Sequence, residues 1–249
     1  MSPAARAFLR GLGDVIFPPT CVQCRGLVEP MGKGEPELQY VCEKCAPLID
    51  FVREPHCTTC GHPFYGIVEG ERSCPHCVGL SPAFSEGRTA VLFKGPARGL
   101  VLELKYHRGL HVLADMKHIF RRAHHVLALA RQAVLVPVPL HPRKERERGY
   151  NQAKLLAEAL ASVAGEGTRL DSLLQRTTDT VSQTAFDRRT RMANLKNAFA
   201  LAKGATITPA LHYLIVDDVF TTGSTLNSCA RALRHAGALN IDVVTFAHG

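Results

Sequence analysis

The chain has 249 residues, of which 46% are hydrophobic and 21% are charged, a composition typical of a globular protein with a substantial core. No apolar run approaches the roughly 18 residues that a membrane-spanning helix requires, so the sequence argues against a membrane span. Residues 1–16 lack the continuous apolar segment and the small-residue cleavage site of a signal peptide, which predicts a cytoplasmic location.

The formal net charge of +8 is unevenly distributed. Residues 1–80 contain 7 Lys or Arg and 9 Asp or Glu residues, whereas residues 81–249 contain 23 and 13. The basic second part suits an anionic ligand, a nucleic acid or both. The cysteine content also changes near residue 80, since no cysteine occurs between Cys77 and Cys229. We therefore expect two domains, residues 1–80 and residues 81–249.

A short amphipathic helix is predicted at the start of the chain, ending before Pro18 and Pro19. Its apolar residues recur at helical spacing: Ala5, Phe8, Leu9, Leu12, Val15 and Ile16. We expect the apolar face to pack on the segment that follows.

Eight cysteines then form four CxxC pairs, whose spacing lets both sulfur atoms of a pair turn toward one metal ion. The pairs are Cys21 and Cys24, Cys42 and Cys45, Cys57 and Cys60, and Cys74 and Cys77. The gaps of 17 residues between the first two pairs and 13 between the last two suit two Cys₄ zinc ribbons. Disulfides would conflict with a cytoplasmic location, so we expect two zinc ions.

Two ways of sharing the cysteines remain open. Sequential pairing, with the first four on one ion and the last four on the other, closes shorter loops and is favoured. Cross-braced pairing is the alternative. His56, His62 and His76 lie beside cysteines, but eight thiolates already complete two tetrahedra. Both ions are therefore expected to be structural.

Residues 81–249 alternate between strand and helix patterns, which predicts an α/β domain with a parallel sheet flanked by helices. Strands are expected at Arg88–Lys94, Ala133–Pro139, a run ending at Val216, and Ile241–Ala247. Helices are expected at Gly99–Tyr106, Gly109–Leu129, from about Asn151 onward, and Leu226–Ala236.

A dense basic segment follows the strand at Ala133–Pro139. Its residues include Leu140, His141, Arg143, Lys144, Arg146 and Arg148. Cations at the amino end of a helix oppose the helix dipole, so their clustering before the next helix needs a reason. A strand-end loop that binds a polyphosphate provides one, and an Arg-rich, solvated helix start is the alternative.

The most informative stretch is Leu214–Leu226, LIVDDVFTTGSTL, in which an apolar strand leads into two acids, a hydroxyl-rich loop and a helix. Such a loop presents free N–H groups and the positive end of the helix dipole to a phosphate. The carboxylates would repel that phosphate and instead suit sugar hydroxyls or a divalent cation. The residues concerned are Asp217, Asp218, Thr221, Thr222, Gly223, Ser224 and Thr225. An ordinary strand–turn–helix with Asp N-caps is the alternative.

This stretch resembles the motif with which type I phosphoribosyltransferases bind phosphoribosyl pyrophosphate (PRPP). The resemblance implies the fold of those enzymes for residues 81–249, and Mg²⁺ as the companion of PRPP. It also implies that Asp217 and Asp218 face the ribose 2′ and 3′ hydroxyls. Residues 221–225 would then surround the 5′-phosphate.

The sequence VPVPLHPRKERERGYNQAKLLAEAL resembles the signature of the ComF family of competence proteins. The resemblance extends over nearly the whole chain, including LKYHRG at Leu104–Gly109, the cysteine pairs, and Gln183, Thr184, Arg188 and Arg191. It implies that the segment Pro139–Arg148 is the pyrophosphate-binding loop. It further implies a role in DNA uptake and natural transformation, or in the use of external DNA as a nutrient.

The basic segment Leu174–Ala200 resembles the mobile catalytic loop of amidophosphoribosyltransferases, which closes over PRPP. A charged connector is the alternative interpretation. Two functions then stay open. The first is an enzyme that transfers phosphoribosyl to an unidentified acceptor and releases pyrophosphate. The second is a non-enzymatic partner of a DNA-uptake helicase that handles single-stranded DNA and keeps PRPP as a regulator, although aromatic residues for base stacking are only 6% of the chain.

Overall fold

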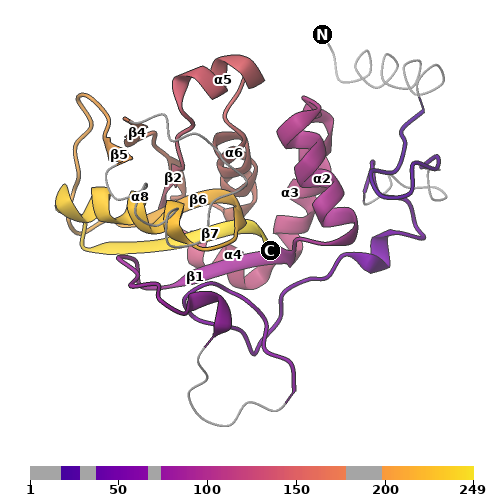
Figure 1. Cartoon of the computed structure of the whole chain (residues 1–249), viewed down its shortest axis with the longest axis horizontal. Helices are drawn as coiled ribbons and strands as arrows, with labels where there is room; N and C mark the ends of the chain where they lie inside the picture. Colours follow the sequence, from indigo (N-terminus) through magenta and orange to yellow (C-terminus); the bar gives the residue numbers. More distant parts are fainter. Residues whose placement is uncertain (1–17, 29–37, 67–73, 178–197) are drawn as a thin grey trace.

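The computed structural model describes residues 18–28, 38–66, 74–177 and 198–249. The helix predicted before Pro18, and the residues Gln183, Thr184, Arg188 and Arg191, lie outside these ranges. Within them, the chain forms a parallel sheet with helices on both faces, and the cysteine segments lie beside it (Figure 1). None of the helices that the structure describes has the length and apolar character needed to cross a membrane.

The sheet has five strands in the order β1-β7-β6-β2-β3, and all neighbouring strands are parallel. The strands are β1 (Gly87–Leu92), β2 (Val134–Pro137), β3 (Arg169–Leu170), β6 (His212–Phe220) and β7 (Asn240–His248). This arrangement confirms the predicted α/β class with a parallel sheet. Strand β6 lies in the middle of the sheet, so the acidic stretch that it carries is central to the fold.

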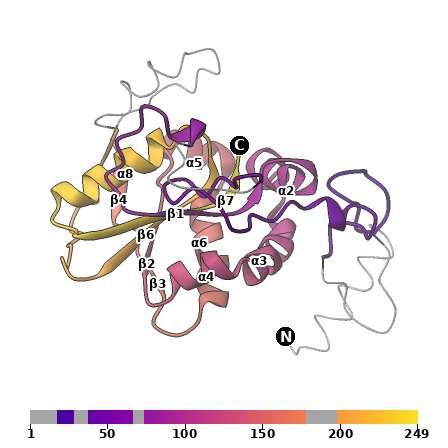
Figure 2. The ribbon, with the colours of Figure 1, turned by 90° about the horizontal axis from the view of Figure 1, so that it is seen from below.

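Helices and a small antiparallel ribbon cover the sheet (Figure 2). The helices are α2 (Gly95–Tyr106), α3 (Leu113–Arg122), α4 (His124–Ala130), α5 (Pro142–Arg148), α6 (Gln152–Ala164) and α8 (Ser224–His235). Three short 3₁₀ helices are η1 (Ala46–Leu48), η2 (Pro75–Cys77) and η3 (Leu110–Val112), and the ribbon pairs β4 (Leu174–Arg176) with β5 (Phe199–Leu201). Helix α8 and this ribbon lie on one face, with α3, α4 and α6 on the other.

The sheet separates two hydrophobic cores. Leu135 and Leu214 pack with the residues of α3 and α6, whereas Val134 and Ile215, their neighbours in sequence, pack with α8. Successive side chains of a strand point to opposite faces, so a strand covered on both faces must be apolar throughout. This requirement explains why uninterrupted apolar runs predicted β2 and β6.

The predicted single helix Gly109–Leu129 is wrong. The chain instead forms η3, α3 and α4, with a break at Ala123, whose φ of −87° and ψ of 73° are not helical. The break lets α3 pack on α6 while α4 reaches β1 as well. Tertiary packing therefore overrides a sequence that is helical on both sides of the break.

The basic segment after β2 was expected as a loop but forms the short helix α5. Pro142 occupies its first turn, and the His141 ring accepts the N–H of Arg143 at 3.3 Å. Gly149 ends the helix in the left-handed region, with φ of 89°. A proline start and a glycine end are typical helix boundaries, so this helix was identifiable from the sequence.

Candidate functional site

Asp217 and Asp218 lie inside β6, although the sequence placed them after the strand. Strand β6 continues because its pairing with β7 extends as far as Phe220 and His248. Asp217 is partly buried and Asp218 is only 4% exposed. Both carboxylates are thus held on a rigid element just before the hydroxyl-rich loop.

The hydroxyl-rich loop begins directly after β6 and runs into α8. The Oγ1 atom of Thr222 and the Oγ atom of Ser224 lie 2.9 Å apart. Gly223 has a φ of 70°, and a Cβ atom placed on it would lie 2.6 Å from Cζ of Phe220, so only glycine fits there. The N-cap residue Gly223 has no side chain that could cap α8, but the N–H of Ser224, the first residue of the helix, donates to Oγ1 of Thr222 at 3.4 Å. The N-terminus of such a helix is a suitable place for an anion, because its first N–H groups have no carbonyl partner inside the helix.

Lys105 is a site residue to which the sequence reasoning gave no role. It lies in α2, and its ammonium group is 3.0 Å from Oδ1 and 2.8 Å from Oδ2 of Asp218. Burial alone would lower the pKa of Lys105, but the charge and hydrogen bond of Asp218 outweigh burial and raise it. The LKYHRG sequence that contains Lys105 was the available signal.

The two neighbouring acids differ in their electrostatics. Burial, and then the charge of Asp218, raise the pKa of Asp217 to about 7, while Lys105 opposes this rise. Asp218 forms the direct ion pair with Lys105. The two acids therefore differ: Asp218 is paired with Lys105, and Asp217 has the raised pKa.

The basic segment starts at the same edge of the sheet. Strand β2 is the neighbour of β6, and the N–H of Val138 donates to the carbonyl oxygen of Val216 at 2.9 Å. Asn151 then fixes the start of α6, since its Nδ2 atom donates to the carbonyl oxygen of Val138 at 2.9 Å. On α5, Arg143 and Arg146 are exposed. The segment that contains Leu140, His141, Arg143, Lys144, Arg146 and Arg148 is thus anchored next to β6.

The end of α2 connects α5 to the acidic strand. Arg108 donates to the carbonyl oxygen of Glu147 at 3.1 Å, and the Tyr150 hydroxyl donates to the carbonyl oxygen of Leu104. Arg148 places its guanidinium carbon 5.9 Å from the centre of the Tyr106 ring. The structure thus brings three distant segments, residues 104–109, 140–148 and 217–225, to one edge of the sheet.

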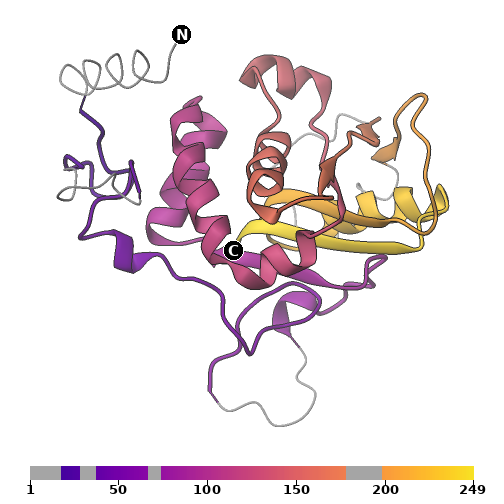
Figure 3. The same ribbon diagram turned by 180° about the vertical axis from the view of Figure 1, so that it is seen from behind.

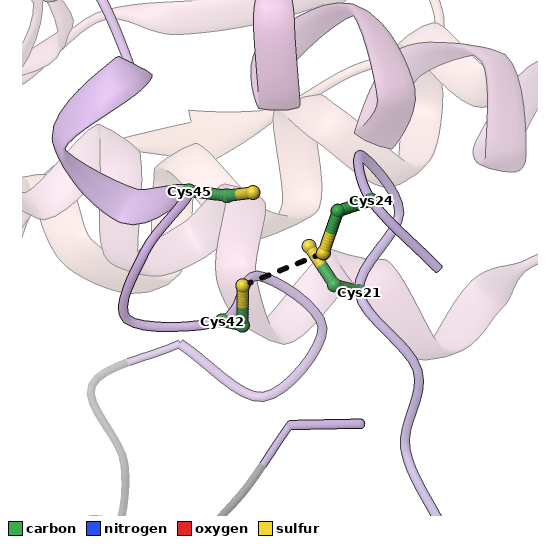
Figure 4. Close-up of side chains that lie close together, drawn as sticks. All are labelled: Cys21, Cys24, Cys42 and Cys45. Carbon is green, nitrogen blue, oxygen red and sulfur yellow. Dashed lines mark hydrogen bonds between the residues drawn. The ribbon is translucent and has the colours of Figure 1, made fainter. Parts of the chain in front are cut away.

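Eight of the nine cysteines form two separate Cys₄ clusters with the sequential pairing, and Figure 4 shows the first of them. The sulfur atoms of Cys24 and Cys42 are 3.7 Å apart in the first cluster. In the second, Cys57 and Cys77 are separated by 3.8 Å and Cys60 and Cys74 by 3.6 Å. A tetrahedral zinc ion with Zn–S bonds of about 2.3 Å separates its sulfur ligands by about 3.8 Å. Both clusters fit a structural zinc ion.

The first knuckles of the two clusters share one local geometry. Cys21 donates its N–H to the carbonyl oxygen of Gly26, and Cys57 does the same to His62, each at 2.8 Å. The residue after each CxxC pair is in the left-handed region: Arg25 with φ of 61° and Gly61 with φ of 75°.

The first ribbon docks on α2 and α3 (Figure 3). The buried carboxylate of Asp115 accepts the N–H groups of Gln39 at 2.7 Å and Tyr40 at 2.8 Å. Val22 approaches α2 so closely that a Cβ atom on Gly99 would lie 3.0 Å from its Cγ2 atom. The ribbon thereby joins the core on the α3 and α6 side of the sheet.

The second ribbon docks on β1 and shares the core on the α8 side. Gly87 donates its N–H to the carbonyl oxygen of Thr58 at 2.7 Å. The Thr89 hydroxyl donates to the carbonyl oxygen of Cys60 at 3.2 Å. Both ribbons thus share cores with the sheet, and the domain boundary near residue 81 stays a prediction.

Comparisons with known proteins agree with this architecture. A family model described as a double zinc ribbon domain matches residues 12–78. Competence protein F of Haemophilus influenzae is 29% identical over 227 residues, covering 90% of this chain and 94% of its own. The DNA utilization protein YhgH of Salmonella typhimurium is 31% identical over 211 residues, covering 82% and 88%. Competence protein ComFC of Bacillus subtilis is 24% identical over 210 residues, covering 80% of each chain.

These similarities run through the cysteine clusters and the α/β sheet alike, because each relative covers at least 80% of the chain. On these grounds the chain belongs to the ComF family.

Proposed function

We propose that this protein binds PRPP at the carboxyl ends of the parallel strands, where the central strand β6 leads into α8. One observation carries the proposal: two carboxylates on a rigid strand lead within three residues into a hydroxyl-rich loop and the N-terminus of α8. This order places acceptors for sugar hydroxyls beside donors for a phosphate. Asp217 and Asp218 would accept hydrogen bonds from the ribose hydroxyls. Residues 221–225 would donate to the 5′-phosphate.

Mg²⁺ would accompany PRPP at this site. Magnesium prefers oxygen ligands and is usually held by one or two carboxylates together with substrate phosphates. Among the described residues, the two Cys₄ sets are the groups of three or more side chains that are close enough to hold a metal ion. A magnesium ion near Asp217 and Asp218 would therefore share its remaining ligands with PRPP and water.

The pyrophosphate of PRPP would lie toward the basic segment. Its start is anchored next to β6, which supports pyrophosphate binding by Leu140, His141, Arg143, Lys144, Arg146 and Arg148. Fixed cations there would stabilise the negative charge that develops on departing pyrophosphate. Gln183, Thr184, Arg188 and Arg191, which the resemblance assigns to the PRPP site, complete this proposal.

The names of the relatives supply the biological setting. They are competence proteins and DNA utilization proteins. We therefore place this PRPP site in a protein of DNA uptake or of external DNA use. Transfer of phosphoribosyl to an acceptor with release of pyrophosphate is the activity that such a site would serve.

PRPP-induced thermal stabilisation in the presence of Mg²⁺ tests the site. The double variant Asp217→Asn with Asp218→Asn should lose most of the shift in Tm that PRPP causes in the wild type. Asp171→Asn is a matched control, because this exposed acid also follows a strand at the same edge of the sheet. An unchanged shift in the double variant would show that the site assignment is wrong.

A second candidate function is handling of single-stranded DNA beside a DNA-uptake helicase, with PRPP as a regulator. The observation that favours it is Tyr106, which is 65% exposed and whose ring lies beside Arg148. Exposed aromatic rings next to cations are typical stacking platforms for single-stranded nucleic acid.

Two assays separate the functions. Pyrophosphate release is measured across nucleobases and amines, with and without single-stranded DNA, and turnover would exclude a purely non-enzymatic role. DNA binding is measured at about 50 mM salt, where phosphate contacts are strong. No binding under that condition would exclude direct DNA handling.

A further inference from the structure

The second zinc ribbon lies against the hydroxyl-rich loop as well as against β1. The chain leaves the ribbon at Cys77, and the N–H of Leu80 donates to the carbonyl oxygen of Cys77 at 2.9 Å. A Cβ atom placed on Gly223 would lie 3.1 Å from Cδ2 of Leu80. A side chain three residues beyond a metal ligand therefore packs directly on the glycine of the loop.

The segment after Leu80 is clamped to the first turn of α8 by Asn227, which is 6% exposed. Its Oδ1 atom accepts the N–H of Ala83 at 2.7 Å, and its Nδ2 atom donates to the carbonyl oxygen of Ser81 at 2.9 Å. The Asn227 N–H itself donates to the carbonyl oxygen of Gly223 at 2.8 Å. The clamp thus joins the end of the ribbon to the helix start that follows the loop.

Histidine rings provide a second connection. His62 and His76, from the two halves of the ribbon, stack with ring centres 4.1 Å apart. Both make T-shaped contacts with His248, with ring centres 4.9 and 4.8 Å apart. His248 stacks on Phe220 at 5.2 Å, and Phe220 directly precedes the loop. Contact therefore runs from the metal knuckles to the residue before Thr221.

These histidines pack rather than coordinate. His248 is 2% exposed and neither of its ring nitrogens has a hydrogen-bond partner in the structure. Among the described residues, the three rings do not bring their nitrogens close enough together to form a metal cluster. The three rings consequently support the residues before the loop by packing. This packing requires that the ribbon that carries His62 and His76 is folded.

We propose that the second Cys₄ site positions the hydroxyl-rich loop, so that metal at Cys57, Cys60, Cys74 and Cys77 keeps residues 221–225 in their anion-binding shape. A small ribbon without its metal cannot stay ordered, because metal binding supplies much of its folding free energy. Loss of this metal would release Leu80, the Asn227 clamp and the histidine stack together. The predicted effect on PRPP binding rests on the proposed function, whereas the predicted effect on the structure of the loop does not.

The first Cys₄ site is a built-in control. Its ribbon contacts α2 and α3 through Val22, Gln39 and Tyr40, and shares the core on the other side of the sheet. Losing its metal should loosen that face and leave the loop unchanged. The two sites have the same ligands and the same knuckle geometry, so any difference between them reflects what each ribbon packs against.

The test compares Cys74→Ser with Cys77→Ser in one variant and Cys24→Ser with Cys42→Ser in the other. Elemental analysis should find about one zinc per chain in each. Amide hydrogen exchange of residues 219–227, without ligand, should be at least about tenfold faster only in the second-site variant. The Kd for PRPP with Mg²⁺ should rise at least about tenfold only in that variant. Unchanged loop exchange there, or equal acceleration in both variants, would overturn the proposal.

Asn227→Ala tests the same proposal if the second-site variant does not fold, because Asn227→Ala keeps all eight metal-binding cysteines. It should retain about two zinc ions and still accelerate exchange of the loop severalfold. Wild-type exchange rates in the loop of this variant would count against the proposal. The exchange measurement needs no ligand, so it stands even if PRPP does not bind to the wild type. In that event the proposed function fails, while the positioning role is still decided.

Discussion

The two zinc ribbons each have four cysteine ligands, and their first knuckles have the same hydrogen bond and a left-handed backbone after the CxxC pair. They nevertheless pack on different sides of the sheet. The first packs on α2 and α3, and the second packs on β1 and the start of α8. Their CxxC spacing therefore determines the metal site, whereas residues outside the cysteines determine where each ribbon lies.

One pair of equivalent positions shows this difference clearly. Arg25 has a left-handed backbone but an exposed side chain, whose Nη1 atom lies 4.0 Å from Oε2 of Glu103 in α2. At the equivalent Gly61, a Cβ atom would lie 2.7 Å from the backbone nitrogen of Thr89. The second ribbon approaches β1 too closely for any side chain, so glycine is required there for space as well as for φ.

The largest effect is expected for Gly61→Ala. The left-handed backbone costs alanine about 1–2 kcal/mol, and the clash with β1 adds about 1–3 kcal/mol. The free energy of unfolding, measured with denaturant, should fall by about 2–5 kcal/mol in total. Arg25→Gly is the matched control and should be neutral or slightly stabilising. Similar destabilisation by both variants would mean that the ribbons do not differ in packing.

Asp115→Ala should loosen the first ribbon instead. The variant leaves the N–H groups of Gln39 and Tyr40 without their buried acceptor, so it should destabilise the protein by about 2–4 kcal/mol. Zinc loss to a chelator should accelerate at one site per chain, and the Kd for PRPP should stay within about twofold of the wild type. Strongly weakened PRPP binding would contradict the separation of the two ribbons.

Lys105→Gln tests whether α2, on which the first ribbon packs, contributes to PRPP binding, because Lys105 belongs to α2. Removing one partner of a buried ion pair costs about 3–5 kcal/mol, and the 25% exposure of the Lys105 side chain reduces the expected loss to about 1–3 kcal/mol. PRPP binding should weaken about tenfold, and Lys105→Arg should restore part of it. If Lys105→Gln binds PRPP with wild-type affinity, α2 does not contribute to the PRPP site.

The acidic pair should add its own pH dependence to the stability, which a comparison of the wild type with Asp217→Asn isolates from that of the ribbons. The pKa of Asp217 is about 7 in the folded protein against an ordinary value of 3.8, so folding favours its protonated form. This contribution is complete below about pH 4 and is lost as pH rises to about 7. The wild type should therefore lose about 2–3 kcal/mol relative to Asp217→Asn between pH 5 and 8. A pH-independent difference in unfolding free energy between the two proteins would contradict the raised pKa.

Much of the fold could be predicted because it depends on local patterns. Apolar runs located β2 and β6, and the CxxC pairs located both metal clusters with their sequential pairing. The prediction failed at Ala123, where one helix became two, and it missed the β4–β5 ribbon, whose partners are separated by more than 20 residues. Neither feature has a local signal, since each depends on packing against distant elements.

The sequence by itself determined the chemistry of this protein: two sets of four thiolates, two adjacent carboxylates, a hydroxyl-rich loop and a basic segment. Only the tertiary structure decided how they are combined. It paired Lys105 with Asp218 across 113 residues and stacked His248 on Phe220 beside the second ribbon. Residue types and short spacings fix which ligands a site can bind, whereas contacts between distant segments exist only once the sheet has set the order of its strands.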